Sequence, residues 1–504
     1  MKKTITSLLM ICCVISLYGQ AAGDSQNVFK VLPAIDSLYK SYSVKYHLPG
    51  MVYGIVYNGR LVKTGNTGYM NISKKLPADS SSDFHIASMS KSFVSMAILQ
   101  LRDRGKLRLD DPASMYIPEL KNQKHVSPDA PAITIRNLLT HSAGFPEDNP
   151  WGDRQLAISD SQMLAMFSKG ISFSNPPGIT YEYSNMGYAM LGYIIKKVSG
   201  KYYADYITDN IFRPLGMNDT YYEYAKVPAN KLTRGYRWLN GSWVEQPMLH
   251  NGAYGAMGGM ITTMSDFAKY LVIHLAAWPP SSDVRRDVLK NSSIREMQKP
   301  WQLRGMDMTF GYGGGKACPT VTGYGYGLRW SQDCEGKVMV GHSGGLPGFG
   351  SNWSFMPDYG LGVICFANST YAPASLINAN ILDTLVKLAG LQPRPVAVSA
   401  ILEQRKKELV KLLPNWDNAE SSGIFAENFF LDYFIDSLKK DANALFMQAG
   451  KITGTRPFVA ENNLRGYFIL QGEKSDIKVY FTLTPEVPAL IQEYRISGVK
   501  KQKE

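Results

Sequence analysis

Residues 84–105 read FHIASMSKSFVSMAILQLRDRG and contain the tetrapeptide Ser88-Met89-Ser90-Lys91. Apolar residues repeat at helical spacing after it, which predicts a buried helix ending near Gly105. A serine and a lysine three positions apart on a helix share a face, so the hydroxyl and the amine can meet. A serine hydroxyl is a weak nucleophile until a neighbouring base takes its proton. The stretch therefore predicts a nucleophilic serine at the start of a helix.

The S-x-x-K spacing recurs at residues 37–40 and 437–440, so this motif alone does not identify a site. The order of motifs along the chain is more specific. The sequence YSN at residues 183–185 follows Ser88, and HSGG at residues 342–345 follows later, on the edge of a β-type run. Together they predict one site assembled from three separate segments of the chain.

The ordered triple S-x-x-K, Y-x-N and [KH]-x-G resembles class C β-lactamases and the D-aminopeptidases, DD-peptidases and esterases related to them. The resemblance covers residues 28 to 390. It includes IRNLLTHSAGFP at 135–146, GAMGGMITTMSDFAKYL at 255–271 and YGYGLRW at 324–330 leading into GHSGGLPGF. KTG at 63–65 and YMN at 69–71 spell the later motifs but precede Ser88, so the family order rejects them.

The resemblance implies a role for each motif residue. Ser88 would attack a carbonyl and form an acyl-enzyme. Tyr183 would be the general base and Lys91 would share its proton, because a neighbouring ammonium lowers the pKa of a phenol. Asn185 would hydrogen-bond Lys91 and the substrate, and His342 would lie in the substrate-binding strand.

The family position of the third motif also implies an oxyanion hole. Its donors would be the backbone N–H groups of Ser88 and Gly345, with Gly344 and Gly345 lining the substrate site. Donors of this kind, held in place before the reaction, stabilise the charge that develops in the transition state. No cofactor is expected, and no cysteine and histidine spacing predicts a metal site.

His342 departs from the Lys-Thr-Gly usual in the β-lactamases of this family. A histidine is mostly neutral at pH 7, so a fixed cation for a substrate carboxylate is missing there. The resemblance then favours an ester or amide hydrolase, acting on a small molecule or a short peptide. Cell-wall-derived peptides ending in D-amino acids are included. A class C-like β-lactamase and a non-catalytic penicillin-binding or sensor protein are the alternatives.

Strands at both ends of the main domain, with helices between them, predict one α/β unit whose sheet is assembled from distant segments. The resemblance implies that this unit has an α/β (α+β) β-lactamase/transpeptidase-like fold, with an antiparallel sheet flanked by helices and a helical region. Strand-like runs at 51–57 and 60–64 flank an Asn-Gly turn, and four more follow the helical region, at 326–330, 337–341, 352–355 and 362–366. A capping box at Thr263 and Asp266 marks one helix start. A helix is expected at 376–388.

The chain is expected to have three parts. Residues 1–23 combine two lysines, an apolar stretch and small residues, as a cleaved signal peptide does. A serine hydrolase domain would span residues 24–392, and a small α+β C-terminal domain residues 393–504. Helices at 402–413 and 429–446 and β-type runs from residue 452 onward indicate the latter.

Export to the periplasm or the cell exterior would permit a disulfide, and Cys318 and Cys334 flank a strand-like segment where they can pair. Cys365 lies in an apolar run and is expected to be buried. The net charge is +12, but the basic residues are scattered, so we expect no nucleic-acid partner. After signal removal no apolar stretch is long enough for a membrane anchor. Oligomeric state is left open.

Overall fold

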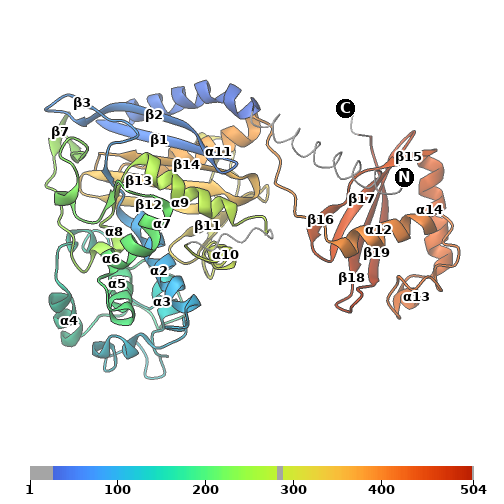
Figure 1. Ribbon diagram of the computed structural model, residues 1–504, viewed down its shortest axis with the longest axis horizontal. Helices are drawn as coiled ribbons and strands as arrows, with labels where there is room; N and C mark the ends of the chain where they lie inside the picture. Colours follow the sequence, from blue (N-terminus) through green and yellow to red (C-terminus); the bar gives the residue numbers. More distant parts are fainter. Residues whose placement is uncertain (1–25, 281–287, 502–504) are drawn as a thin grey trace. The chain divides into compact units, whose positions relative to one another are not determined.

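The computed structural model describes residues 26–280 and 288–501, which form two compact units (Figure 1). The first unit ends at Pro393 and the second begins at Arg394. Each unit has its own hydrophobic core. The predicted signal peptide, residues 1–23, lies outside the described residues.

A nine-stranded antiparallel sheet is the centre of the first unit, in the order β3-β2-β1-β14-β13-β12-β11-β10-β9. Its strands are β1 (Gly50–Tyr57), β2 (Arg60–Asn71), β3 (Leu76–Pro77), β9 (Gln302–Asp307), β10 (Thr320–Tyr324), β11 (Arg329–Gln332), β12 (Val338–Leu346), β13 (Phe349–Met356) and β14 (Leu361–Ala367). The first and last strands of this unit in sequence order, β1 and β14, are neighbours, with Val52 opposite Phe366. This confirms a sheet assembled from distant segments, and with it the predicted fold class.

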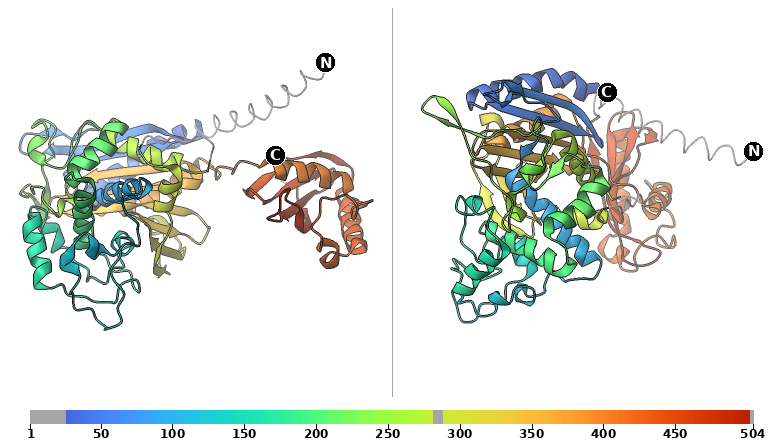
Figure 2. Two further views of the ribbon diagram at one scale, coloured as in Figure 1. Left: turned by 60° about the horizontal axis from the view of Figure 1, so that its bottom comes forward. Right: turned by 60° about the vertical axis from the view of Figure 1, so that its left-hand side comes forward.

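The two faces of this sheet pack against different helices. Tyr53, Ile55 and Cys365 belong to a core shared with the helix at 26–45 and with α11 (Ala374–Leu388). Val52 and Ile364 belong to the larger core on the other face, which contains the helical region. This division follows from the strand geometry, because successive side chains of a strand point to opposite faces. Figure 2 shows helices on both sides of the sheet.

The helical region contains mostly short helices. They are α2 (Lys91–Asp103), α3 (Ile135–Leu139), α4 (Asp160–Lys169), α5 (Asn185–Ser199), α6 (Tyr203–Ile207), α7 (Arg213–Leu215), α8 (Gly255–Gly258), α9 (Met264–Ala276) and α10 (Asn291–Met297). Two small sheets accompany them. One joins β4 (Phe84–His85), β8 (Ile261–Thr262) and β5 (Thr220–Tyr221), and the other joins β6 (Tyr236–Leu239) and β7 (Ser242–Glu245).

Two local predictions in this unit were wrong. Of the strand expected at 326–330, only residues 329 and 330 are extended, in β11, because residues 325–328 form the turn between β10 and β11. Gly325 N–H donates to Leu328 O at 2.7 Å there, and Gly327 has φ of 69°. At α9, Thr263 accepts from the Asp266 N–H, but the reciprocal half of a capping box is missing. The Asp266 carboxylate instead accepts the N–H of Asp219 at 2.7 Å.

The second unit is a five-stranded antiparallel sheet packed against helices. Its elements are α12 (Ala400–Leu412), α13 (Phe429–Asp432), α14 (Ile435–Ala449), β15 (Ile452–Thr455), β16 (Val459–Asn462), β17 (Arg465–Gly472), β18 (Asp476–Leu483) and β19 (Ile491–Val499). The helix expected at 429–446 is broken at Tyr433, which has extended backbone angles. The first of the β-type runs expected from residue 452 onward forms two short strands, β15 and β16, which both pair with β17.

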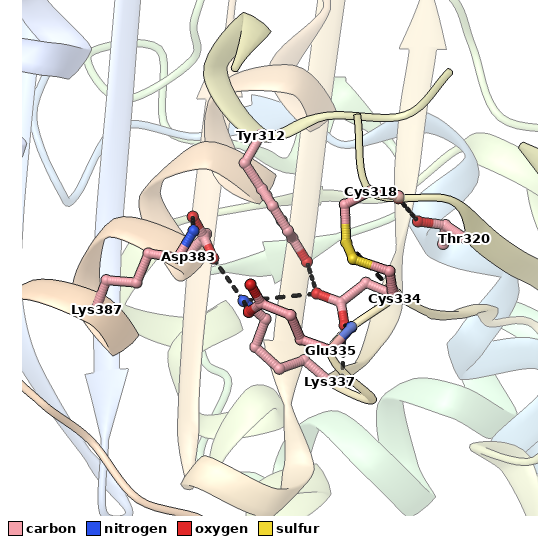
Figure 3. Close-up of a disulfide and its surroundings, with 9 residues drawn as sticks. Tyr312, Cys318, Thr320, Cys334, Glu335, Lys337, Asp383 and Lys387 are labelled. Carbon is pink, nitrogen blue, oxygen red and sulfur yellow. Dashed lines mark hydrogen bonds and ion pairs between the residues drawn. A yellow bond between two sulfur atoms is a disulfide. The ribbon is translucent and has the colours of Figure 1, made fainter. Parts of the chain in front are cut away.

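A disulfide between Cys318 and Cys334 joins the outer ends of β10 and β11, with the Cα atoms 5.2 Å apart (Figure 3). Beside it the buried Lys337 ammonium lies 2.6 Å from Asp383 of α11, and the Tyr312 hydroxyl donates to Asp333 at 2.8 Å. These contacts connect the loop before β10 to the β11–β12 turn and to α11.

The structure thus forms the Cys318–Cys334 pair that the sequence had left open. Cys365 is buried, as expected.

Candidate active site

Ser88 lies in a 3₁₀ turn, Ala87–Ser90, that continues directly into α2. Strand β12 passes very close to this turn. A Cβ at Gly344 would come within 2.1 Å of Ile86 O, so only glycine fits at that position. The approach places the third motif beside the serine. Ser351 of β13 also donates to Ile86 O at 2.8 Å and holds the turn against the sheet.

Lys91 is fully buried and has three polar neighbours. Its Nζ lies 3.0 Å from Ser88 Oγ, 2.7 Å from Asn185 Oδ1 and 2.8 Å from Met257 O. The two latter oxygens can only accept hydrogen bonds. A neutral amine has two N–H groups for them and one lone pair, which then faces the serine hydroxyl. The geometry suits a lysine that takes the serine proton.

Burial lowers the pKa of Lys91 to about 7. The carboxylates of Asp153 and Asp148 act in the opposite direction, and Arg329 adds to the lowering. A lysine with this pKa is substantially neutral near pH 7, whereas an exposed lysine is charged. The amine can therefore act as a base without a partner that first removes its proton.

Tyr183 is buried at the start of α5, and Lys91 Nζ lies 4.9 Å from the centre of its ring. Burial raises the pKa of Tyr183 well above its ordinary value, while a hydrogen bond with Ser88 and the charge of Arg329 lower it. The net shift is therefore upward, whereas the lowering by a neighbouring ammonium had led us to expect a lowered pKa. The cost of burying a phenolate exceeds the stabilisation by nearby charge.

Asn185 owes its position to a loop whose residues had no predicted role. The Asp148 carboxylate accepts the N–H groups of Asn185 at 2.6 Å and of Met186 at 2.7 Å, at the N-terminus of α5. Asn185 Nδ2 donates to Asn149 Oδ1 at 2.6 Å. That bond identifies Oδ1 as the atom facing Lys91.

His342 is buried, and its hydrogen bonds define a neutral tautomer. Nδ1 lies 2.6 Å from Ser343 O, which can only accept, so Nδ1 carries the proton. Nε2 then accepts from the Tyr324 hydroxyl at 2.9 Å. Burial and the charge of Arg329 lower the pKa of His342 well below its ordinary value. His342 therefore supplies no cation.

His141 is a second buried histidine at the site that sequence reasoning passed over. Its Nδ1 accepts the N–H of Ser184 at 3.0 Å, and its ring packs 4.3 Å from the ring of Tyr183. Burial and the charge of Lys91 lower its pKa well below the ordinary value. His141 thus positions Tyr183 through its neighbour Ser184. The signal was present in the THSAGFP segment, but no role followed from it.

A pocket of about 420 Å³ opens above Ser88. Its lining contains Ser88, Tyr183, Gly344 and Gly345, together with Asn149, Pro150, Asp153, Arg329, Ser343, Tyr371, Ala372, Pro373 and Ser375. The buried Lys91 and Asn185 are not among the lining residues, and His342 lines an adjacent groove instead. The structure thus brings together all seven predicted site residues. Four of them line the pocket, two lie buried behind it, and His342 lies to one side.

Arg329 lies where the pocket meets the groove, and no role had been predicted for it. It belongs to β11, opposite Gly341 of β12, and its guanidinium lies 5.9 Å from the centre of the Tyr183 ring.

Within residues 26–280 and 288–501, no group of three or more metal-ligand side chains occurs. No helix of those residues has the length and apolar character of a membrane span.

Comparisons with known proteins agree with this geometry. The family model described as Beta-lactamase matches residues 35–386. Protein flp of Staphylococcus aureus strain MW2 is 28% identical over 74% of this chain and 70% of its own length. Beta-lactamase-like protein 4 of Dictyostelium discoideum is 27% identical over 79% of this chain and 70% of its own length. The flp protein of strain COL matches over 65% of its own length.

A solved structure shows the same fold. The octameric penicillin-binding protein homologue from Pyrococcus abyssi superposes with a TM-score of 0.60 and 23% identity, covering 90% of this chain and 91% of that one.

Proposed function

The chain belongs to the beta-lactamase family of serine hydrolases, and on that premise we propose that it hydrolyses esters or amides through an acyl-enzyme at Ser88. Peptides ending in D-amino acids are included among the substrates. One observation carries the proposal. Lys91 Nζ is buried between Ser88 Oγ and two oxygens that only accept hydrogen bonds, which directs its lone pair at the nucleophile.

In the proposed reaction Ser88 Oγ bonds to the substrate carbonyl carbon while its proton moves to Lys91 Nζ. The bond to the leaving group then breaks. The Tyr183 phenol, beside Ser88, donates its proton to the leaving group and receives a proton from Lys91 in its place. Water later attacks the acyl carbon and loses a proton to Lys91. The bond between that carbon and Ser88 Oγ then breaks, the acid product leaves, and Oγ takes the proton from Lys91. The raised pKa of Tyr183 favours a donor here, in place of the general-base role expected from the family.

The oxyanion formed in each step would be held by the backbone N–H groups of Ser88 and Gly345. Both residues line the same pocket, and the close approach of Gly344 to Ile86 brings their segments together. Backbone donors of this kind contribute about 3 kcal/mol of transition-state stabilisation each.

Because His342 is neutral, a different residue must supply the positive charge that binds a substrate carboxylate. Arg329 is exposed and lines the pocket beside Ser343. A guanidinium offers a planar pair of donors that suits a carboxylate. We therefore assign the carboxylate of a peptide-like leaving group to Arg329.

Export to the periplasm or the cell exterior is part of the proposal. The signal-like residues 1–23 and the disulfide between Cys318 and Cys334 support it, because structural disulfides persist in oxidising compartments. Expression of the full chain in a bacterial host, followed by N-terminal sequencing of the periplasmic fraction, tests this. Cleavage near residue 23 is expected, and an uncleaved cytoplasmic product would contradict it.

The activity is tested with the mature protein and with Ser88→Ala on a short-chain p-nitrophenyl ester, beside a chromogenic cephalosporin. Ester turnover lost in the variant, with slow or absent cephalosporin turnover, is the expected result. Rapid cephalosporin turnover through Ser88 would identify a β-lactamase. Equal inertness of both proteins, with stable cephalosporin binding, would favour a non-catalytic penicillin-binding or sensor protein.

A further inference from the structure

A second groove, of about 340 Å³, adjoins the pocket above Ser88. Arg329, Ser343 and Ser375 line both cavities. The groove continues outward over strands β9 to β13, and Arg304 of β9 lies on its lining. A ligand part placed there would be continuous with a substrate held at Ser88.

The lining of the groove has two guanidinium groups against one carboxylate, and neither guanidinium forms an ion pair within the described chain. Arg304 packs over the Tyr181 ring at 4.8 Å, and Arg329 lies over that of Tyr183 at 5.9 Å. Neither guanidinium has a hydrogen bond or an ion pair to any residue in the described ranges. The one carboxylate among the lining residues, Asp307, accepts the N–H and the hydroxyl of Thr309, each at 2.9 Å.

Several hydroxyl groups also line the groove. Its lining includes Thr320, Thr322, Ser331, Ser354 and Ser375. The wall at Thr320 is held by the adjacent Cys318–Cys334 bond and by the ion pairs of Lys337 with its neighbours (Figure 3). A wall fixed in this way retains its shape without a ligand, which lowers the entropy cost of binding.

We propose that this groove is a binding subsite for the leaving-group side of the substrate, and that Arg304 and Arg329 together recognise a second anionic group on it. The inference rests on the proposed function and extends it to doubly anionic leaving groups. Arg329 would bind the first carboxylate at the junction of the two cavities, and Arg304 the second one in the groove. Each guanidinium lies over a tyrosine ring and has no ion-pair partner, and a planar guanidinium is suited to a planar anion such as a carboxylate.

The test uses three N-acetyl-D-alanine esters that differ only in the leaving group: phenol, 3-hydroxybenzoate and 5-hydroxyisophthalate. The mature protein is expected to show a kcat/KM for the isophthalate ester that exceeds the value for the benzoate ester roughly tenfold or more. In Arg304→Gln this ratio should fall close to one. In Arg329→Gln the ratio of kcat/KM for the benzoate ester to kcat/KM for the phenyl ester should fall as well.

Arg60→Gln is the matched control, because Arg60 is exposed at the β1–β2 turn and lines neither cavity. It removes the same charge and should leave both ratios unchanged. An isophthalate-to-benzoate ratio that is the same in Arg304→Gln as in the native protein would overturn the proposal. A ratio lowered equally by Arg60→Gln would also overturn it, since general charge would then explain the preference.

Failure of the proposed function is detected separately. If none of the three esters is turned over through Ser88, isophthalate and benzoate are titrated calorimetrically into Ser88→Ala. Tighter binding of isophthalate, lost on adding Arg304→Gln, supports the subsite independently of catalysis. Equal affinities for the two anions, or no binding of either, overturn it.

Discussion

Two segments of this protein have the same S-x-x-K pattern and opposite surroundings. Ser88 and Lys91 are buried, and Lys91 contacts oxygens from α5 and α8. Ser437 and Lys440, on α14 of the second unit, are both exposed. The spacing brings a hydroxyl and an amine to one helix face in each case. Lys91 differs from Lys440 because it is desolvated and has acceptors for two amine protons, which favours the neutral amine that a base requires.

The copy at Ser37 and Lys40 supports the same conclusion. Both residues are exposed, and the Ser37 hydroxyl donates to Pro33 O of its own helix at 3.2 Å. That bond is the usual local one for a serine within a helix. The elements packed over a two-residue motif therefore distinguish the buried copy, which we propose to be reactive, from the two exposed copies.

The largest effect should separate Ser88→Ala from Ser437→Ala. Loss of the Ser88 nucleophile is expected to reduce kcat/KM for a p-nitrophenyl ester by roughly a thousandfold or more. Ser437→Ala should leave it unchanged. Steady-state kinetics on both purified variants, with thermal unfolding to establish that each is folded, provides the measurement. Similar losses in both variants would remove the distinction between the two copies.

The next effect concerns the pH dependence of stability. Between about pH 8 and 10 Lys91 is neutral when folded and protonated when unfolded, so the unfolded state binds one more proton. The free energy of unfolding should therefore rise with pH by about 1.4 kcal/mol per unit more in the native protein than in Lys91→Met. Urea titrations across that range measure it.

Lys440→Met is the matched control, because Lys440 is exposed in the folded protein. Its pH slope should equal that of the native protein. An equal slope in Lys91→Met would show that Lys91 stays charged in the folded state.

A smaller effect should appear in the pH–rate profile for neutral p-nitrophenyl acetate. kcat/KM should rise with pH through an apparent pKa near 7, because the reactive form of Lys91 is the free amine. Asp153→Asn removes an anion that raises the Lys91 pKa, so the rise should move to lower pH. Arg329→Gln removes a cation that lowers it, and should move the rise to higher pH. Shifts of both variants in one direction would contradict this assignment.

The smallest effect is expected for the paired substitutions at the exposed copies. Ser37→Ala with Lys40→Met, and Ser437→Ala with Lys440→Met, should change the free energy of unfolding by no more than about 0.5 kcal/mol each. Ester turnover should be unaffected. Denaturant titration and kinetics on each double variant provide the values, and a tenfold loss of activity in either would assign that copy a role.

The sequence, through its motif order and the resemblance that this order carries, predicted the fold class and named seven candidate site residues that the structure brings together. Alternating apolar runs predicted most strands within a few residues, since pleated strands impose a period of two. They did not predict the turn at 325–328 or the break at Tyr433, where local backbone geometry overrides residue type. The sequence left the pairing of Cys318 with Cys334 open, and the folded hairpin of β10 and β11 brings the two together.

Only the tertiary structure decided the protonation of those residues and what holds them in place. Asp148, Asn149 and His141 lie far in sequence from Ser88, and their contacts with α5 exist only after packing. The neutral state of His342 and the raised pKa of Tyr183 follow from burial, which no residue spacing encodes. Desolvation energy depends on everything that surrounds a group. The sequence motif identifies the residues that we propose to react, and the folded environment determines their protonation.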